Sequence, residues 1–156
     1  MFLLYTGLRA GDVSYLKYGD LDTNNDMITP LVRKSKRKHR FPLADILLKE
    51  MSYWGGEDEP LFPTLYGETY DERNDLYAKP RKYLQRILKK NNRDKANLHS
   101  FRVTFNCILR NNGLGIEDRQ KLLAHSSSAT TQIYTHPNPE LARVHINKIP
   151  SYFNGV

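Results

Sequence analysis

Apolar residues recur at the three- and four-residue spacing of amphipathic helices in several stretches of this 156-residue chain. Turns rich in Gly, Pro and Asn separate these stretches. The pattern predicts helices over about residues 6–17, 44–54, 98–112, 116–124 and 139–148, and a basic helix after residue 75 that buries Leu76, Tyr83, Leu84, Ile87 and Leu88. Most of the chain is therefore expected to be helical.

Two shorter stretches near the N-terminus have the character of strands. Residues 27–34 and 39–45 flank a basic turn around residues 35–38, which predicts an antiparallel hairpin. Pro30 favours an edge strand, because proline has no N–H to donate to a central ladder. The whole pattern predicts one α+β domain over residues 1–156, mostly α-helical with a small antiparallel β-sheet.

One arginine interrupts the helical pattern by occupying an apolar row. Arg9 stands in register with Val13 and Leu16, in the first turn of a helix for which Thr6 is the expected N-cap. A cation is unfavourable at this place, because the N-terminal end of a helix dipole is positive.

Arg102 repeats the anomaly, on the row that holds Phe105, with His99 one turn earlier on the same face. A buried arginine is costly unless it is paired. A local acid could form an ion pair with either arginine taken alone, as Asp12 could with Arg9. Two arginines with the same anomaly indicate a shared anion. A phosphodiester fits, because each guanidinium group can donate two hydrogen bonds to its oxygens.

The distribution of charge indicates the same kind of partner. The chain has a formal net charge of +7 and a pI of about 9.5. Lys and Arg are concentrated in residues 33–40 and 79–95, whereas acids gather in residues 57–75. Two basic blocks suit a partner with a line of phosphates, although a single block could equally be a solvated surface.

Several classes of protein are disfavoured by what the sequence lacks. Cys107 is the single cysteine, which excludes a disulfide framework, and we expect it in the core. The longest unbroken apolar run, residues 1–5, is too short for a signal sequence or a membrane span. Asp20 and Asp22 lie in a turn with no further carboxylate grouped with them, so we expect no metal and no cofactor. These features favour a soluble protein of the cytoplasm without a membrane partner.

Four short motifs follow one another between residues 5 and 136: "TGLRAGD", "KSKRKHRFPL", "HSFRVTF" and "LAHSSSATTQIYTH". They resemble, in this order, the first-arginine box, the lysine hairpin, the His-x-x-Arg box and the nucleophile segment of the tyrosine recombinases, the family of phage integrases and Xer proteins. Each motif alone is weak evidence, but the joint order is specific.

The resemblance implies a site-specific recombinase or integrase that cleaves and rejoins double-stranded DNA without metal or ATP. Tyr134 would attack the phosphodiester and form a 3′-phosphotyrosyl bond, while Arg9 and Arg102 bind the scissile phosphate. Lys34, with Lys36 as the alternative, would protonate the leaving 5′-hydroxyl, and two histidines would assist proton transfer. The catalytic set is then Arg9, Lys34, His99, Arg102, His125 and Tyr134.

Some positions depart from the family pattern. Asp12 stands where the family usually has Glu, Ala124 replaces a Gly, and Val103 replaces a frequent His. Only eight residues precede Arg9. The resemblance therefore implies a catalytic domain without the N-terminal DNA-clamping domain of the family.

The surface and the tail carry further expectations. The basic blocks should contact DNA through Lys36, Arg37, Lys38, Arg81 and Lys82. Residues 137–156 should form a C-terminal tail helix, and we expect residues 138–149 to pack across a subunit contact or to be mobile in a monomer. The resemblance implies a homotetramer on DNA, assembled through this tail, in association with the nucleoid.

Two alternatives remain open at this stage. A type IB topoisomerase uses a similar set of residues, although the segment from His125 to Tyr134 resembles the recombinase form more closely. A basic DNA-binding module without catalysis would explain the charge, but it leaves Arg9, Arg102 and Tyr134 unexplained. The target sequence and the biological role, whether integration, excision or chromosome resolution, stay open as well.

Overall fold

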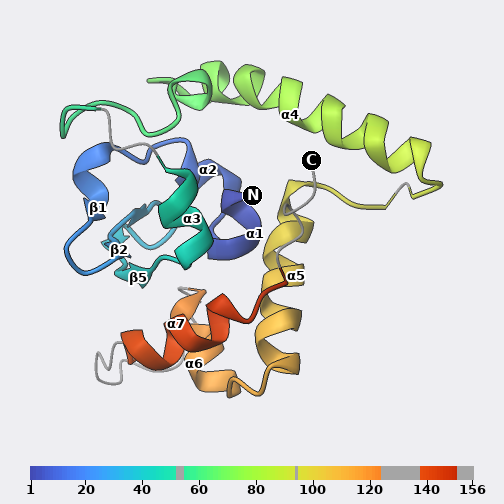
Figure 1. The fold of residues 1–156 in the computed structure, drawn as a ribbon. Helices are drawn as coiled ribbons and strands as arrows, with labels where there is room; N and C mark the ends of the chain where they lie inside the picture. The colour runs from blue at the N-terminus through green and yellow to red at the C-terminus, as the bar shows by residue number, and fades with distance from the viewer. Residues whose placement is uncertain (52–54, 94, 124–137, 151–156) are drawn as a thin grey trace.

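Residues 1–51, 55–93, 95–123 and 138–150 are described by the computed structural model of the chain, which is mostly helical with two small antiparallel sheets (Figure 1). This confirms the predicted fold class. The elements are, in chain order, α1 (Phe2–Thr6), α2 (Ala10–Val13), η1 (Tyr18–Asp20), β1 (Leu21–Asp22), β2 (Met27–Ile28), β3 (Leu31–Val32), β4 (Arg37–Lys38), β5 (Phe41–Pro42), α3 (Asp45–Glu50), η2 (Pro63–Leu65), α4 (Tyr70–Lys90), α5 (Leu98–Asn111), α6 (Ile116–Leu122) and α7 (Pro139–Asn147). The helix α3 ends at Glu50 rather than at residue 54, because Met51 is extended.

Pro30 divides the first predicted strand into two. Before it, β2 lies between β1 and β5 in a three-stranded antiparallel sheet, with Ile28 opposite Leu21 on one side and Phe41 on the other. After it, β3 pairs with β4 as a separate two-stranded hairpin, and the N–H of His39 donates to the carbonyl of Pro30 at 2.9 Å. The hairpin is confirmed, whereas β1 occupies a segment that the sequence pattern leaves as turn.

The core lies between the three-stranded sheet, α1 and α5, and the last two helices close it from below in the view of Figure 1. Its largest fully buried side chains include Tyr5, Leu16, Phe41, Phe105 and Ile146. Cys107, expected in the core, is only half-buried, because the row of α5 that faces the core is the row of Phe105.

The predicted helix over residues 6–17 is wrong in its bounds: within it only the short α2 forms, and α1 ends at its first residue. Gly7 ends α1 in the left-handed region at φ +60°, which L side chains rarely adopt. Thr6 is therefore not an N-cap: its hydroxyl donates to the carbonyl of Phe2 at 2.8 Å and accepts from the N–H of Leu8 at 3.3 Å.

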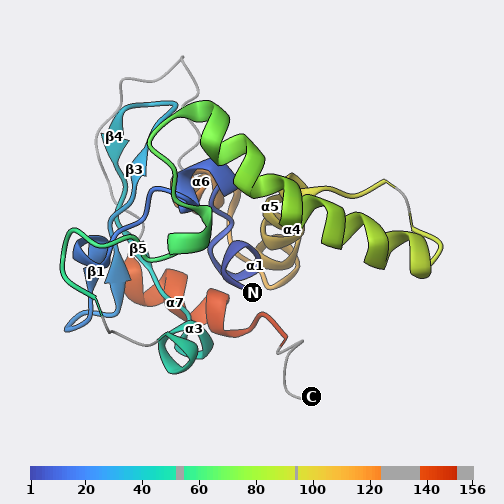
Figure 2. The ribbon, with the colours of Figure 1, turned by 90° about the horizontal axis from the view of Figure 1, so that it is seen from above.

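The helix α4 extends away from the rest of the domain over much of its length (Figures 1 and 2). In the second half of the helix, the predicted buried face is wrong at Tyr83 and Ile87, which are 59% and 41% exposed, whereas Leu84 and Leu88 are partly buried. Tyr77 is buried instead, at 6%. The helix has few neighbours there, so apolar spacing alone does not secure burial.

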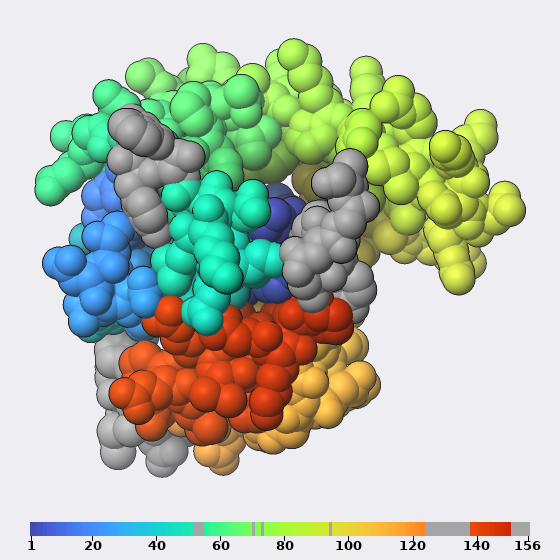
Figure 3. Space-filling view, viewed as in Figure 1, coloured from blue at the N-terminus to red at the C-terminus, as the bar shows by residue number. Residues whose placement is uncertain are grey.

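The helix α7 is docked on its own domain, between α3 and α6 (Figure 3). Ala142 and Ile146 are buried in the core, and Arg143 forms ion pairs with Asp26 at 2.6 Å and Asp45 at 2.8 Å. The expectation that this helix is mobile in a monomer is therefore wrong, whereas a subunit contact through its exposed face stays a prediction. Residues 151–156 of the predicted tail lie outside the described part of the chain.

No helix within the described residues is long and apolar enough to cross a membrane.

Candidate active site

Arg102 is held inside the domain by two backbone carbonyls. It lies in the second turn of α5, whose N-cap Asn97 accepts from the N–H of His99 at 2.9 Å, and it is only 5% exposed. One Nη donates to the carbonyl of Gly7 at 2.7 Å, and the other donates to the carbonyl of Leu123. These bonds join α5 to the turn after α1 and to the end of α6. They orient the guanidinium group without neutralising its charge.

Arg9 sits at the N-cap of α2 rather than in its first turn. Its backbone is extended, at φ −71° and ψ 140°, and its side chain is 30% exposed. The charge is answered by buried Asp12, whose Oδ2 lies 3.8 Å from the Arg9 Nη1. Asp12 stands in the first turn of α2, where the helix dipole favours an anion.

The two arginines influence each other electrostatically. The pKa of Arg102 is lowered to about 10, first by burial and second by the positive charge of Arg9, while Asp12 opposes the shift. Arg102 therefore remains protonated at neutral pH. Two neighbouring cations, one of them buried, favour the binding of an anion that both can reach. That they hold one and the same anion stays a prediction.

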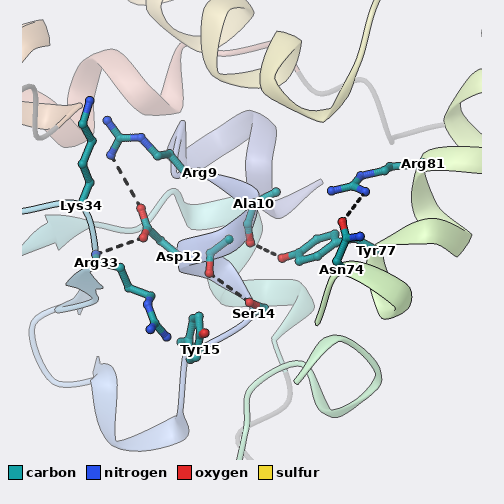
Figure 4. Close-up of a pocket in the computed structure, with 11 residues that line it drawn as sticks. Arg9, Ala10, Asp12, Ser14, Tyr15, Arg33, Lys34, Asn74, Tyr77 and Arg81 are labelled. Carbon is teal, nitrogen blue, oxygen red and sulfur yellow. Dashed lines mark hydrogen bonds and ion pairs between the residues drawn. The ribbon is translucent and has the colours of Figure 1, made fainter. Parts of the chain in front are cut away.

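The lysine hairpin is hydrogen-bonded to Asp12, the residue that pairs with Arg9. The N–H of Arg33 donates to Asp12 Oδ1 at 3.2 Å, and Lys34 follows directly. In Figure 4 the side chains of Lys34 and Arg9 extend next to each other. Lys36 lies further along the turn, at φ 54°.

A pocket of about 400 Å³ opens beside these residues. Arg9 and Lys34 both line it, whereas Lys36 does not. Its other lining residues are Ala10, Gly11, Asp12, Ser14, Tyr15, Arg33, Asn74, Tyr77 and Arg81 (Figure 4). The pocket therefore brings together the first-arginine box, the hairpin and α4.

The remaining predicted catalytic residues lie beyond this pocket or outside the described chain. His99 is exposed, in the first turn of α5 and one turn before Arg102. His125 and Tyr134 lie outside the described residues. Leu123 is the last described residue before the segment that contains them, and its carbonyl accepts a hydrogen bond from Arg102.

His39 is a connecting residue that the sequence pattern does not reveal. Its Nε2 is 3.0 Å from the carbonyl of Leu122, so the residue directly after β4 is hydrogen-bonded to the end of α6. Within the basic block the only available signal is its place among lysines and arginines, which does not indicate a structural bond.

The predicted DNA-contacting cations lie on two projecting elements. Arg37 and Lys38 form β4, and Arg81 and Lys82 lie on α4, all with exposed side chains. Figure 2 shows that the β3–β4 hairpin and α4 both extend from the body of the domain. The described residues contain no cluster of three or more His, Cys, Asp or Glu side chains that could hold a metal ion.

A mostly helical domain with a carbonyl-bound arginine, next to a pocket lined by a second arginine and a lysine hairpin, is the tyrosine recombinase class of catalytic domain. The sequence model of the Phage integrase family matches residues 1–140, and the chain belongs to that family.

Known relatives agree with this assignment. The chain is 31% identical over 143 residues to a probable integrase/recombinase of Acholeplasma phage L2, covering 90% of this chain and 48% of that protein. It is 34% identical over 145 residues to the tyrosine recombinase XerC of Pediococcus pentosaceus, covering 86% of this chain and 47% of that protein. The chain thus spans about half the length of these relatives.

Solved structures share the fold. The integrase from mycobacterium phage Brujita superposes with a TM-score of 0.68 at 17% identity, over 99% of this chain and 52% of the other. The XerA recombinase superposes with a TM-score of 0.57 at 27% identity, over 96% of this chain and 57% of the other.

Proposed function

We propose that this chain is the catalytic domain of a site-specific recombinase, which cleaves and rejoins double-stranded DNA through a 3′-phosphotyrosyl bond to Tyr134, without metal or ATP. The observation that carries the proposal is the pocket that Arg9 and Lys34 both line. Buried Arg102 is near it, because the charge of Arg9 lowers the pKa of Arg102. Family membership supports it. A related fold, the Tn1549 transposon integrase, is known in complex with circular intermediate DNA.

The arginines supply the charge that the reaction requires. Attack on phosphorus builds negative charge on the non-bridging oxygens, and fixed cations stabilise that charge. A guanidinium group has about five N–H donors, and Arg102 uses two of its nitrogens on carbonyls, so donors remain for a phosphate. Arg9, which is partly exposed, can reach the same oxygens from α2.

Proton transfer completes the proposed step. The Tyr134 hydroxyl, with an ordinary pKa near 10, attacks well only if its proton leaves as the O–P bond forms, and His99 or His125 would accept it. The bond from phosphorus to the 5′-oxygen breaks, and Lys34 would give that oxygen a proton. The new phosphodiester keeps the energy of the old one, so reversal by a 5′-hydroxyl rejoins the strand.

Trapping the intermediate tests this function. Nicked duplexes with a randomised central sequence lose the short 5′-hydroxyl strand after cleavage, so the protein stays attached to DNA. In EDTA we expect a covalent adduct on a denaturing gel for the wild-type chain and for Tyr83→Phe, an exposed tyrosine of α4, but none for Tyr134→Phe. Absence of an adduct from the wild-type chain, or its persistence in Tyr134→Phe, would contradict the proposal.

The finer part of the proposal is assembly into a homotetramer on DNA at the nucleoid, because exchange between two duplexes requires four cleaved strands. The outer face of α7 offers a contact surface: Leu141 and Val144 are 45% and 53% exposed, while Ala142 and Ile146 hold the helix to its own domain. Cross-linking on DNA should yield tetramers with the wild-type chain and fewer with Leu141→Asp/Val144→Asp.

A type IB topoisomerase would instead relax supercoiled DNA without exchanging strands between duplexes.

A further inference from the structure

The helix α4 has one fully buried side chain among those described, and it packs on the domain near that residue. At 21 residues it extends over about 30 Å. Among its described side chains, Tyr77 alone is buried, at 6% exposure, and it lies in the first half of the helix. The second half carries exposed Tyr83 and Ile87 and projects beyond the domain in Figures 1 and 3. Tyr77 is therefore the deepest contact between the described side chains of α4 and the rest of the domain.

The other end of this contact is the backbone next to a proposed catalytic residue. The Tyr77 hydroxyl donates to the carbonyl of Ala10, the first residue of α2 and the neighbour of Arg9 (Figure 4). Burial raises the pKa of Tyr77, so the hydroxyl keeps the proton that it donates. Tyr77 and Arg9 also line the same pocket.

The basic charge of α4 suits contact with DNA under the proposed function. Arg81 lies one turn after Tyr77, with its Nη1 2.8 Å from Asn74 Oδ1 and its guanidinium carbon 5.9 Å from the centre of the Tyr77 ring. A phosphate bound by Arg81 or Lys82 would thus pull on the turn of helix that contains Tyr77.

We propose that Tyr77 is a positioning residue, which transmits the placement of α4 on DNA to the backbone at Arg9. This inference rests on the proposed function. Arg9 is the extended N-cap of α2, so rotation of the peptide between Arg9 and Ala10 moves the guanidinium group relative to the scissile phosphate. Displacements of about 1 Å at a reacting centre have large effects on rate.

Removal of the hydroxyl alone tests the inference. Tyr77→Phe keeps the buried ring, and Tyr83→Phe is the matched control, because Tyr83 is exposed on the same helix and its ring contact with Arg86 survives. With saturating nicked duplex, we expect Tyr77→Phe to lower the single-turnover rate of adduct formation about tenfold, with a Kd for DNA unchanged within about twofold. Tyr83→Phe should change neither quantity. A wild-type rate in Tyr77→Phe, or a parallel loss of rate and affinity, would overturn the inference.

A second measurement does not depend on cleavage. In NMR spectra, Tyr77→Phe should move the carbonyl carbon of Ala10 upfield, because that carbonyl loses a donor. Adding duplex DNA should shift the Arg9 side-chain Nε–H signal in the wild-type chain and in Tyr83→Phe, but much less in Tyr77→Phe. If the wild-type chain forms no adduct, the proposed function fails while these spectra still test the coupling. Equal Arg9 responses in Tyr77→Phe and the wild-type chain would overturn it.

Discussion

At the scale of single residues, Gly7 has two roles in the structure. Its positive φ of +60° ends α1, and its carbonyl accepts from buried Arg102. A Cβ built on it would lie 2.3 Å from Cδ1 of Phe105, a ring that is fully buried. Gly7 therefore contacts both Arg102 of the candidate site and Phe105 of the core.

Gly7→Ala should destabilise the domain strongly, because alanine is strained at this φ and its methyl group overlaps Phe105. We expect the free energy of unfolding to fall by roughly 2–4 kcal/mol in chemical denaturation. Gly11→Ala is the control: it lies inside α2 with no atom within 4 Å of the added methyl, and it should be neutral or stabilising by roughly 0.5–1 kcal/mol. Equal effects of the two substitutions would contradict this account.

The choice between the two candidate lysines is also a matter of single residues. Lys34 lines the pocket beside Arg9, whereas Lys36 does not. We expect Lys34→Ala to lower the cleavage rate about 100-fold or more, and Lys36→Ala to change it about twofold at most. A substrate with sulfur as the 5′ leaving atom needs no proton, so it should restore the rate of Lys34→Ala. Loss of cleavage in Lys36→Ala with an active Lys34→Ala would reverse the assignment.

At the scale of elements, the docking of α7 depends on ion pairs at its edge as well as on apolar burial. Arg143 contacts Asp26 and Asp45, and hydrogen bonding from Arg143 is the main reason why the pKa of Asp45 is below its ordinary value. A carboxylate with a lowered pKa in the folded state stabilises that state above its unfolded pKa, and the contribution disappears as the pH falls through the folded value. Docking should therefore weaken in acid.

Arg143→Met tests this sign. The variant should be less stable than the wild-type chain at pH 6, by about 1 kcal/mol or less per pair because the groups are partly exposed, and the difference should shrink below about pH 4. Urea denaturation at pH 3 and pH 6 measures it, with Lys148→Met as a control at the C-cap of the same helix. A difference that does not vary with pH would show that Arg143 acts through packing alone.

The sequence predicts most elements of this fold, and its errors have local physical causes. The Arg102 row of α5 is buried as its periodicity indicates, and α7 falls within the predicted residues 139–148. The helix through Gly7 fails because periodicity ignores a glycine that tertiary packing against Phe105 holds in the left-handed region. The docking of α7 on its own domain is not predictable from the pattern, because Asp26 and Asp45, with which Arg143 forms ion pairs, are distant from it in sequence.

Some residues of the candidate site can also be predicted from the sequence, whereas others cannot. Arg9 and Arg102 are recognisable because they are misplaced on apolar rows, which is a signal within the sequence. The bonds of His39 to Leu122 and of Tyr77 to Ala10 connect residues far apart in the chain and leave no such signal. His125 and Tyr134 lie outside the described residues, so their roles stay predictions.

At the scale of the whole molecule, charge separates into projecting basic elements and an acidic loop. Neutralising Arg37 with Lys38, or Arg81 with Lys82, should weaken binding to all duplexes alike. Each double variant should reduce the slope of log K against log salt concentration by about 0.9 for every phosphate that the protein no longer neutralises. Fluorescence anisotropy from low to moderate salt measures the slope. Lys49→Gln, on α3 away from both basic elements in Figure 2, should leave it unchanged, and a weakening restricted to one DNA sequence would indicate base reading instead.

The central claim is that one tyrosine becomes joined to the 3′ side of a broken DNA strand, and peptide mapping of the adduct tests it most directly. Cleavage by trypsin after Lys121 and Arg143 releases residues 122–143, in which Tyr134 is the single tyrosine. After nuclease digestion in EDTA, mass spectrometry should find this peptide with a nucleotide linked through its 3′-phosphate to Tyr134. A nucleotide on any other peptide, or one linked through a 5′-phosphate, would contradict the account.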